Sequence, residues 1–309
     1  MRLLKELPMK QCKGTIFQIQ RWSINDGEGV RSTVFLKGCP LRCKWCANPE
    51  SWNKKPEVLF FQEKCVGCNR CSSVCSTNAI TIEKDINHFN REECCGCAKC
   101  CEVCPTGARK MIGSTVTVED VLKVIKRDAI FYRESGGGVT FSGGEPFAQP
   151  EFLRQLVVAC NQLGLDTAVE TSGYFDFEQV KDIIERLDCI FVDIKHMDDE
   201  THKKMTGVSN HTILENIAQI SQIHPNTIVR VPLMEEINAN EQNIKSMCEF
   251  LKKNTRVKGV ELLPYHDFGE SKYSAVGAHS QTFTTPNDAK MEDIKTIIST
   301  YGIRILDFK

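Results

Sequence analysis

The chain has 309 residues, of which 41% are hydrophobic, 26% are charged and 17 are cysteine. This composition excludes a disordered chain, and the formal net charge of −1 argues against nonspecific binding to nucleic acid or to an acidic membrane surface. No apolar run reaches the length of a membrane span and the N-terminus is too charged for a signal peptide, so we expect a cytoplasmic protein with reduced, metal-binding thiols.

Strand-like and helix-like segments alternate along the chain outside residues 53–112. The predicted strands are rich in Val, Ile, Phe and Thr and are bounded by turn residues; they are 32–37, 138–142, 166–170, 189–194, 227–233 and 258–263. The predicted helices have apolar residues at helical spacing; they are 117–132, 149–163, 176–187, 210–223, 240–253 and 287–301. Six strand–helix units predict an α/β fold with a parallel sheet, a partial (β/α)6 barrel that resembles an open TIM barrel.

Thirteen of the cysteines lie between Cys39 and Cys104, and most of them form two runs with the spacing of bacterial ferredoxins. The runs are Cys65, Cys68, Cys71 and Cys75, then Cys94, Cys97, Cys100 and Cys104. In such runs the first three thiolates surround one cubane and the fourth binds the other cluster. We therefore assign one [4Fe–4S] cluster to Cys65, Cys68, Cys71 and Cys104, and a second to Cys94, Cys97, Cys100 and Cys75.

Two zinc sites are the alternative for these runs, although zinc modules usually place a longer spacer between two cysteine pairs. Cys95 and Cys101 are extra thiols that we expect to be free. The alternative is a shift of register in which they replace Cys94 or Cys100 as cluster ligands. The segment 53–112 interrupts the first strand–helix unit. We expect it to be a ferredoxin-like insert held together by its clusters, within a barrel formed by 1–52 and 113–309.

A third group, Cys39, Cys43 and Cys46, has only three cysteines and follows the first predicted strand. Three protein ligands leave one iron of a [4Fe–4S] cluster with an open coordination position, which is typical of a site that performs chemistry. The spacing alone is not specific, because Cys97, Cys101 and Cys104 match it by chance. Its place directly after a strand favours the first group.

Other chemically distinctive residues follow or end the remaining predicted strands. Because the carboxyl ends of parallel barrel strands form one rim, we expect these residues to meet Cys39 at a single active site. They are Gly143, Gly144, Glu145, Glu170, Asp193, Lys195, Arg230 and His266.

The segments 38–51, 136–146, 193–197 and 261–266 together resemble those of radical S-adenosylmethionine (SAM) enzymes. More narrowly, the chain resembles the glycyl radical enzyme activating enzymes, the relatives of pyruvate formate-lyase activating enzyme. The segment 25–31 is similar to a family segment with proline where this chain has Glu28. The insert resembles that of the larger activating enzymes, which have a two-cluster ferredoxin-like domain.

The resemblance implies roles for the rim residues, and no side chain is expected to act as a general acid or base. SAM would chelate the open iron of the cluster at Cys39, Cys43 and Cys46. Gly143 and Gly144 would let the backbone approach its methionine moiety. The resemblance further implies adenine contacts by Trp45 and His266, ribose and carboxylate contacts by Asp193 and Lys195, an ammonium contact by Glu145, a further cofactor contact by Arg230, and a monovalent cation at Glu170 and Asp193.

The implied reaction is reductive cleavage of SAM to a 5′-deoxyadenosyl radical, which takes a hydrogen atom from a glycine Cα of a partner glycyl radical enzyme. No glycyl radical motif is present in this chain, so the glycine is expected in trans on the partner, with this chain a monomer. The two auxiliary clusters would relay electrons from a flavodoxin or ferredoxin; purely structural or docking roles are the alternative.

Two other functions remain as alternatives. The first is a radical SAM enzyme that modifies another peptide or a small molecule, although such enzymes tend to place extra clusters after the barrel. The second is an electron-carrying ferredoxin-like protein, which would leave about 250 residues and the rim motifs unexplained. A zinc-based nucleic-acid binder does not fit the charge, since the chain lacks a basic stripe.

Overall fold

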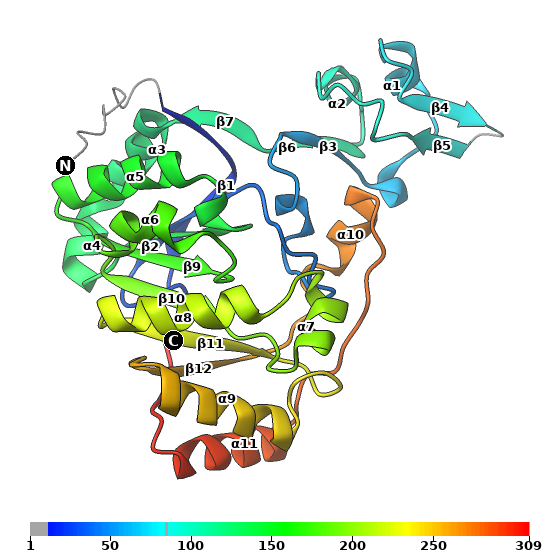
Figure 1. The fold of residues 1–309 in the computed structure, drawn as a ribbon. Coiled ribbons are helices and arrows are strands. Elements are labelled where there is room, and N and C mark those ends of the chain that lie inside the picture. Colours follow the sequence, from blue (N-terminus) through cyan, green and yellow to red (C-terminus); the bar gives the residue numbers. More distant parts are fainter. Residues whose placement is uncertain (1–11, 84–85, 309) are drawn as a thin grey trace.

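The computed structural model describes residues 12–83 and 86–308 and contains a nine-stranded sheet in the order β13-β12-β11-β10-β9-β8-β2-β1-β7. Seven neighbouring strands of this sheet, β2 and β8 to β13, run parallel to one another (Figure 1). Their bounds are β2 Arg31–Leu36, β8 Gly138–Gly143, β9 Asp166–Thr171, β10 Cys189–Asp193, β11 Thr227–Leu233, β12 Gly259–Pro264 and β13 Ile305–Leu306. The predicted partial barrel and its six strands are therefore confirmed.

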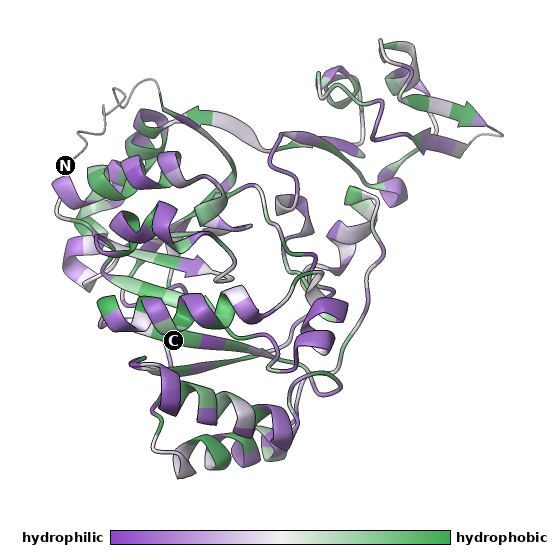
Figure 2. Cartoon of the chain, viewed as in Figure 1, coloured by the Kyte–Doolittle hydropathy of each residue, from purple (hydrophilic) through white to green (hydrophobic). Residues whose placement is uncertain are grey.

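Most of the helices cover the outside of the sheet, whereas α7 lies at the carboxyl ends of the strands and α10 packs against residues 49–51 and 57–60 (Figure 1). The helices are α3 Val118–Ile125, α4 Ala129–Ser135, α5 Pro150–Gln162, α6 Phe177–Ile184, α7 Asp199–Thr206, α8 His211–Ile223, α9 Glu241–Asn254, α10 Glu270–Val276 and α11 Asp288–Thr300. Their outward faces are largely hydrophilic (Figure 2). None of the helices in the described ranges is long and apolar enough to cross a membrane.

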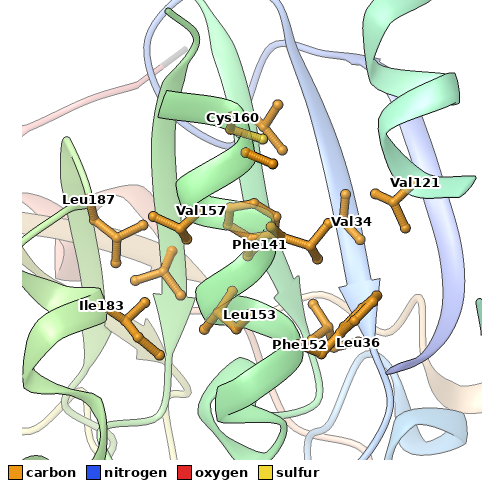
Figure 3. Packing of buried hydrophobic residues seen from close by; sticks show 14 of the residues in the cluster. Val34, Leu36, Val121, Phe141, Phe152, Leu153, Val157, Cys160, Ile183 and Leu187 are labelled. Atoms are coloured by element: carbon orange, nitrogen blue, oxygen red, sulfur yellow. The ribbon is translucent and has the colours of Figure 1, made fainter. Parts of the chain in front are cut away.

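The largest hydrophobic core lies between strands β2 and β8 and helices α3, α5 and α6 (Figure 3). Val34 and Phe141 project from the strands toward Val121, Leu153 and Val157 of the helices, and all five side chains are buried. Burial of each such side chain stabilises the fold by about 1.5–3 kcal/mol. This core holds the carboxyl ends of β2 and β8 in register, which positions the residues that follow them.

Several features of the barrel were not predicted. An antiparallel edge is formed by β1 Lys13–Ser23, which pairs with both β2 and β7 Ser114–Thr117. The predicted helix 117–132 divides at a 3₁₀ turn where buried Asp128 accepts two hydrogen bonds from Arg21, at 2.5 and 2.6 Å. The short helices α7 and α10 and the two-residue strand β13 were not predicted either.

The insert forms a small lobe that stands away from the barrel (Figure 1). It contains two antiparallel strand pairs, β3 Glu57–Phe60 with β6 Arg109–Ile112 and β4 Ile80–Glu83 with β5 Ile86–Phe89. Two single-turn helices complete it, α1 Arg70–Ser73 and α2 Lys99–Glu102. The hydrophobic cluster among its described residues has three buried members, Val58, Ile80 and Cys100, so packing alone stabilises it little. These elements lie inside the predicted range 53–112, whose exact ends remain a prediction.

Candidate active site

A cavity of about 270 Å³ opens at the carboxyl ends of the parallel strands. Residues from all six predicted strand ends line it, as expected for a parallel barrel. The predicted site residues among them are Cys39, Cys43, Cys46, Trp45, Gly143, Gly144, Glu170, Asp193, Lys195, Arg230 and His266. Glu145 is the one predicted rim residue that does not line this cavity.

The loop that carries the three cysteines is held by backbone hydrogen bonds to helix α7. The amide of Arg42 donates to the carbonyl of Thr206 at 2.7 Å, and the amide of Lys44 donates to the carbonyl of Met205 at 3.0 Å. On the other side, the Tyr273 hydroxyl of α10 donates to the carbonyl of Cys43 at 3.2 Å. Two helices that the sequence did not predict therefore clamp the cysteine loop.

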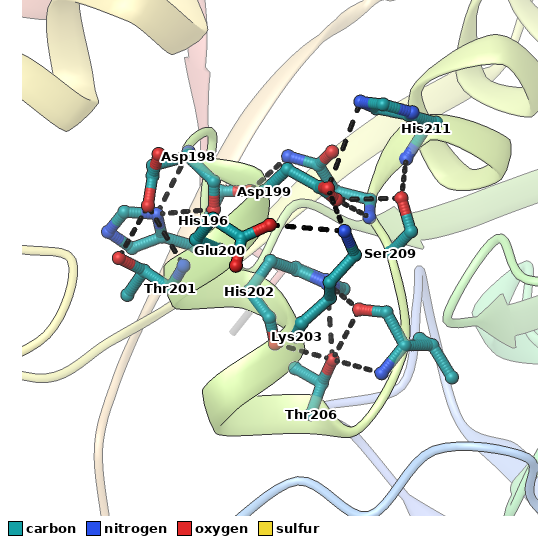
Figure 4. Close-up of polar contacts among 12 residues, drawn as sticks. His196, Asp198, Asp199, Glu200, Thr201, His202, Lys203, Thr206, Ser209 and His211 are labelled. Carbon is teal, nitrogen blue, oxygen red and sulfur yellow. Dashed lines mark hydrogen bonds and ion pairs between the residues drawn. The ribbon is translucent and has the colours of Figure 1, made fainter.

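Helix α7 is itself fixed by polar contacts rather than by an apolar face (Figure 4). Asp198 caps it by accepting from the Thr201 amide at 2.8 Å. Asp199 accepts from Lys203 at 2.6 Å and from the Ser209 hydroxyl at 2.7 Å. The hydrogen bond from Lys203 and then that from Ser209 hold the pKa of the Asp199 carboxyl well below its usual range. The network fixes the two carbonyls that receive the cysteine loop.

Gly143 and Gly144 bring the end of β8 against the cysteine loop. The amide of Gly144 donates to the carbonyl of Leu36, and the amide of Glu145 donates to that of Gly38, each at 2.8 Å. Gly143 has a φ of +114°, and a Cβ on Gly144 would lie 2.5 Å from the Gly38 carbonyl oxygen. Glycine is thus required here because the two chain segments approach so closely.

Glu145 lies beneath this turn, 1% exposed, and its carboxylate accepts four hydrogen bonds from its own chain. Oε1 accepts from the Thr171 hydroxyl at 2.8 Å and from the Phe147 amide at 3.2 Å. Oε2 accepts from the Ser172 amide at 2.9 Å and from its hydroxyl at 2.5 Å. Burial raises the pKa of Glu145. The arrangement makes this carboxylate the link between the ends of β8 and β9.

Two sets of buried charges form the wall of the cavity. Lys195 pairs with Asp193, with 2.5 Å between Nζ and Oδ2. Although burial lowers the pKa of Lys195, the charges of Asp193 and Cys43 outweigh it and raise that pKa. Arg230 pairs with Glu261, with 2.5 Å between Nε and Oε2, and also with Glu170. Both carboxylates in the predicted cation site therefore already have a cationic partner.

Aromatic side chains border the same cavity. Trp45 packs edge-on against Phe283, with ring centroids 6.0 Å apart. Tyr265 packs edge-on against the same ring at 5.7 Å, and His266 stacks on exposed Phe268 at 4.3 Å. Flat apolar surfaces of this kind suit a planar base such as adenine.

In the lobe, two further cavities separate the remaining cysteines into two sets. One is lined by Cys65, Cys68, Cys71 and Cys104, and the other by Cys75, Cys94, Cys97 and Cys100 together with the extra Cys95. Over the described ranges, no three Cys, His, Asp or Glu side chains converge closely enough for a single metal ion. Four thiols line the first cavity and five line the second, which is enough for the four thiolates that a [4Fe–4S] cluster takes.

Several site residues were not identified from the sequence. Ser142 and Ser172 line the main cavity, and the Ser142 hydroxyl donates to Glu170 at 2.5 Å. Burial raises the pKa of Cys46 to about 11, and the Trp52 side chain is among the groups that act against this. The Asn87 side chain donates to the sulfur of Cys71. Ser142 and Trp52 lie in or directly beside the segments that carry the resemblance. Nothing in the sequence pattern marked Asn87.

Known families match both parts of the chain. The profile of the radical SAM superfamily matches residues 94–250, and that of the 4Fe-4S dicluster domain matches residues 64–108. A radical SAM methyltransferase from Sphaerobacter thermophilus shares the fold at a TM-score of 0.50 and 14% identity, over 89% of this chain and 65% of that one. Fold, cavity and cysteine sets define a radical SAM protein with [4Fe–4S] clusters and SAM as its cofactors.

Relatives of similar length narrow the class. The 4-hydroxyphenylacetate decarboxylase activating enzyme of Clostridioides difficile (strain 630) is 42% identical over 95% of this chain and 96% of its own length. The choline trimethylamine-lyase activating enzyme of Oleidesulfovibrio alaskensis is 40% identical over 96% of this chain and 98% of its own. The chain belongs to the glycyl radical enzyme activating enzymes. Its protein substrate is accordingly a glycyl radical enzyme.

Proposed function

We propose that the main cavity binds SAM on a [4Fe–4S] cluster held by Cys39, Cys43 and Cys46. The observation that carries this proposal is that three thiols and residues from the ends of six parallel strands line one cavity. When bound, the cluster and SAM supply the 5′-deoxyadenosyl radical that takes a hydrogen atom from the partner's glycine Cα. The chain's own residues bind, orient and shield the reactants.

In this proposal each part of the cavity wall contacts one part of SAM. Trp45 and His266 hold the adenine, whereas Asp193 and Lys195 hold the ribose and the methionyl carboxylate. The turn at Gly143 and Gly144 presents backbone to the methionine moiety. The ammonium group of SAM contacts the Glu145 carboxylate. This contact requires that SAM displace one of the internal hydrogen bonds that the carboxylate accepts.

Arg230 supplies a further contact, which is supported by the buried state of its Nη2 atom and the absence of any hydrogen-bond partner for that atom in the described ranges. A monovalent cation at Glu170 and Asp193 would compete with Arg230 and Lys195 for the same oxygens. Exchange of K⁺ and Na⁺ in a SAM-binding assay tests this part of the proposal directly.

We further propose that the lobe, residues 53–112, holds two auxiliary clusters inside a barrel made of 1–52 and 113–309. The ligands are Cys65, Cys68, Cys71 and Cys104 for one cluster, and Cys94, Cys97, Cys100 and Cys75 for the other. The two separate lobe cavities support this division. In this arrangement the clusters relay electrons inward from a flavodoxin or ferredoxin.

Iron content and EPR test the three-cluster assignment. Reconstituted wild-type protein should hold about twelve irons per chain. Cys43→Ala should lose the EPR change caused by SAM and about four irons, while Cys71→Ser should disturb an auxiliary signal only. Retention of the SAM-dependent signal by Cys43→Ala would contradict the assignment.

The identity of the partner is a finer proposal. The relatives activate a decarboxylase and a lyase, as their names state, at nearly equal identity to this chain. We therefore propose a glycyl radical enzyme of this lyase or decarboxylase group, acted on by a monomer of this chain. A panel of such enzymes, each tested for a glycyl radical after incubation with this protein, SAM and a reductant, identifies the partner. A panel member that this chain converts far faster than the others supports the proposal.

A further inference from the structure

A buried arginine in the lobe has no anionic partner among the residues that the structure describes. Arg109 on β6 is 2% exposed and forms no ion pair with any described residue. Its Nη2 donates to Oδ1 of Asn87 at 2.6 Å, whereas Nε and Nη1 are buried without a hydrogen-bond partner over the same residues. A buried guanidinium with two unused donors is costly unless an anion faces it.

The other surroundings of Arg109 do not supply that anion. Its guanidinium lies over the rings of Phe60 and Phe89, at 4.3 and 4.6 Å from their centroids. A second cation, Arg91, lies over Phe89 at 4.8 Å and donates to the carbonyls of Val58 and Ala275. Two cations thus share one aromatic ring, which makes the need for negative charge greater.

The missing anion fits the cavity that Arg109 lines. That cavity is also lined by Cys65, Cys68, Cys71 and Cys104. Four thiolates around an oxidised [4Fe–4S] core carry two negative charges in total, and one electron from an external donor adds a third. Asn87 connects the arginine to this site, because its Nδ2 donates to Sγ of Cys71 at 3.3 Å while its Oδ1 accepts from Arg109.

Neither Arg109 nor Asn87 lines the second lobe cavity. Each cavity has one threonine hydroxyl beside a ligand sulfur, Thr106 at 3.8 Å from Cys104 and Thr77 at 3.7 Å from Cys75. These matched contacts cancel in a comparison of the two sites. Arg109 and Asn87 line only the first cavity. Donors and positive charge near the sulfurs favour the reduced, more negative cluster.

We propose that Arg109 and Asn87 raise the reduction potential of the cluster at Cys65, Cys68, Cys71 and Cys104, making it the higher-potential member of the auxiliary pair. This inference rests on the proposed assignment of the auxiliary ligands. Asn87 contacts a sulfur of the first set only, so it should affect one potential. The net charge of Arg109 acts over a longer range, so it should affect both potentials and that of the cavity it lines more strongly.

The test is an EPR-monitored redox titration of the reconstituted full-length protein, with the SAM-binding cluster recognised by its response to SAM and the first auxiliary couple assigned with Cys71→Ser. Arg109→Gln should lower the reduced-to-oxidised ratio of that couple about tenfold at a given potential, a negative shift of about 59 mV for one electron. Asn87→Ala should shift the same couple in the same direction by less and leave the other couple unchanged.

Arg70→Gln is the matched control, because Arg70 lines the same cavity with the same charge but is exposed. It should leave both couples in place. If Arg109→Gln loses iron, the potentials of Arg109→Lys and Asn87→Ala test the inference instead. Lysine keeps the positive charge, so Arg109→Lys should shift the first auxiliary couple less than Asn87→Ala does.

Unchanged auxiliary potentials in Asn87→Ala and in either Arg109 variant would overturn the inference while leaving the ligand assignment intact. Wild-type protein with iron for only one auxiliary cluster would instead overturn the ligand assignment, and the inference with it.

Discussion

Arg230 on β11 and Glu261 on β12 are direct neighbours across the parallel sheet and form a buried ion pair, 2.5 Å from Nε to Oε2. The same guanidinium pairs with Glu170 on β9, two strands away. One cation therefore neutralises two carboxylates inside the barrel, and its Nη2 has no hydrogen-bond partner among the described residues.

Arg230→Met should destabilise the protein strongly, because it leaves partly buried Glu170 and buried Glu261 without their cationic partner. Breaking a buried pair in this way costs about 3–5 kcal/mol. Chemical unfolding measures the loss. The double variant Glu170→Gln with Glu261→Gln, in the Arg230→Met background, should recover part of it, and failure of that recovery would show that the carboxylates are not the cause.

Glu145→Gln should destabilise the protein even without SAM. A glutamine at this position turns an amide group toward hydrogen-bond donors, which leaves buried donors without acceptors at about 1–3 kcal/mol each. Thermal unfolding of the SAM-free protein checks this, with the exposed Glu185→Gln as control. Wild-type stability combined with weak SAM binding would make Glu145 chiefly a ligand contact instead.

Lys272→Met should weaken the attachment of the SAM-binding cluster. Lys272 on α10 pairs with Glu50 at 2.8 Å and donates to the Ala47 carbonyl at 3.0 Å and to Asn48 Oδ1 at 2.9 Å, all in the chain just after Cys46. Without it, nearly buried Glu50 loses its cation, so this loop should open more often.

The measurement is the rate at which each cluster is lost on exposure to air. In Lys272→Met the SAM-responsive EPR signal should decay severalfold faster than in wild type, while the auxiliary signals keep their rates. The exposed Lys55→Met serves as control. Equal acceleration of all three clusters would point to general destabilisation.

Much of the barrel and its site could be predicted because the information is local. Runs such as Cys189–Asp193 are apolar and β-rich, and the carboxyl ends of parallel strands must share one edge. Helix α7 could not be found in this way, since Asp199–Thr206 has no apolar stripe and is held by caps and ion pairs. The pairing of Arg230 with Glu261 depends on the order of strands.

The proposed roles of Asn87 and Arg109 could not be predicted from the sequence for a related reason. Asn87 reaches Cys71 across 16 residues, and Arg109 reaches Asn87 across 22. Only the folded lobe brings the three together. The sequence shows a charged residue in a short strand, which would ordinarily face solvent.

The most direct test of glycyl radical formation by this protein is an anaerobic assay. The reconstituted protein is mixed with a reductant, SAM and a glycyl radical enzyme encoded nearby, and glycyl radical and 5′-deoxyadenosine are quantified in the same sample. We expect a carbon-centred EPR doublet with matching deoxyadenosine, and neither product with Cys43→Ala. Deoxyadenosine without a doublet on any partner tested, or neither product from protein that holds three clusters, would contradict the account.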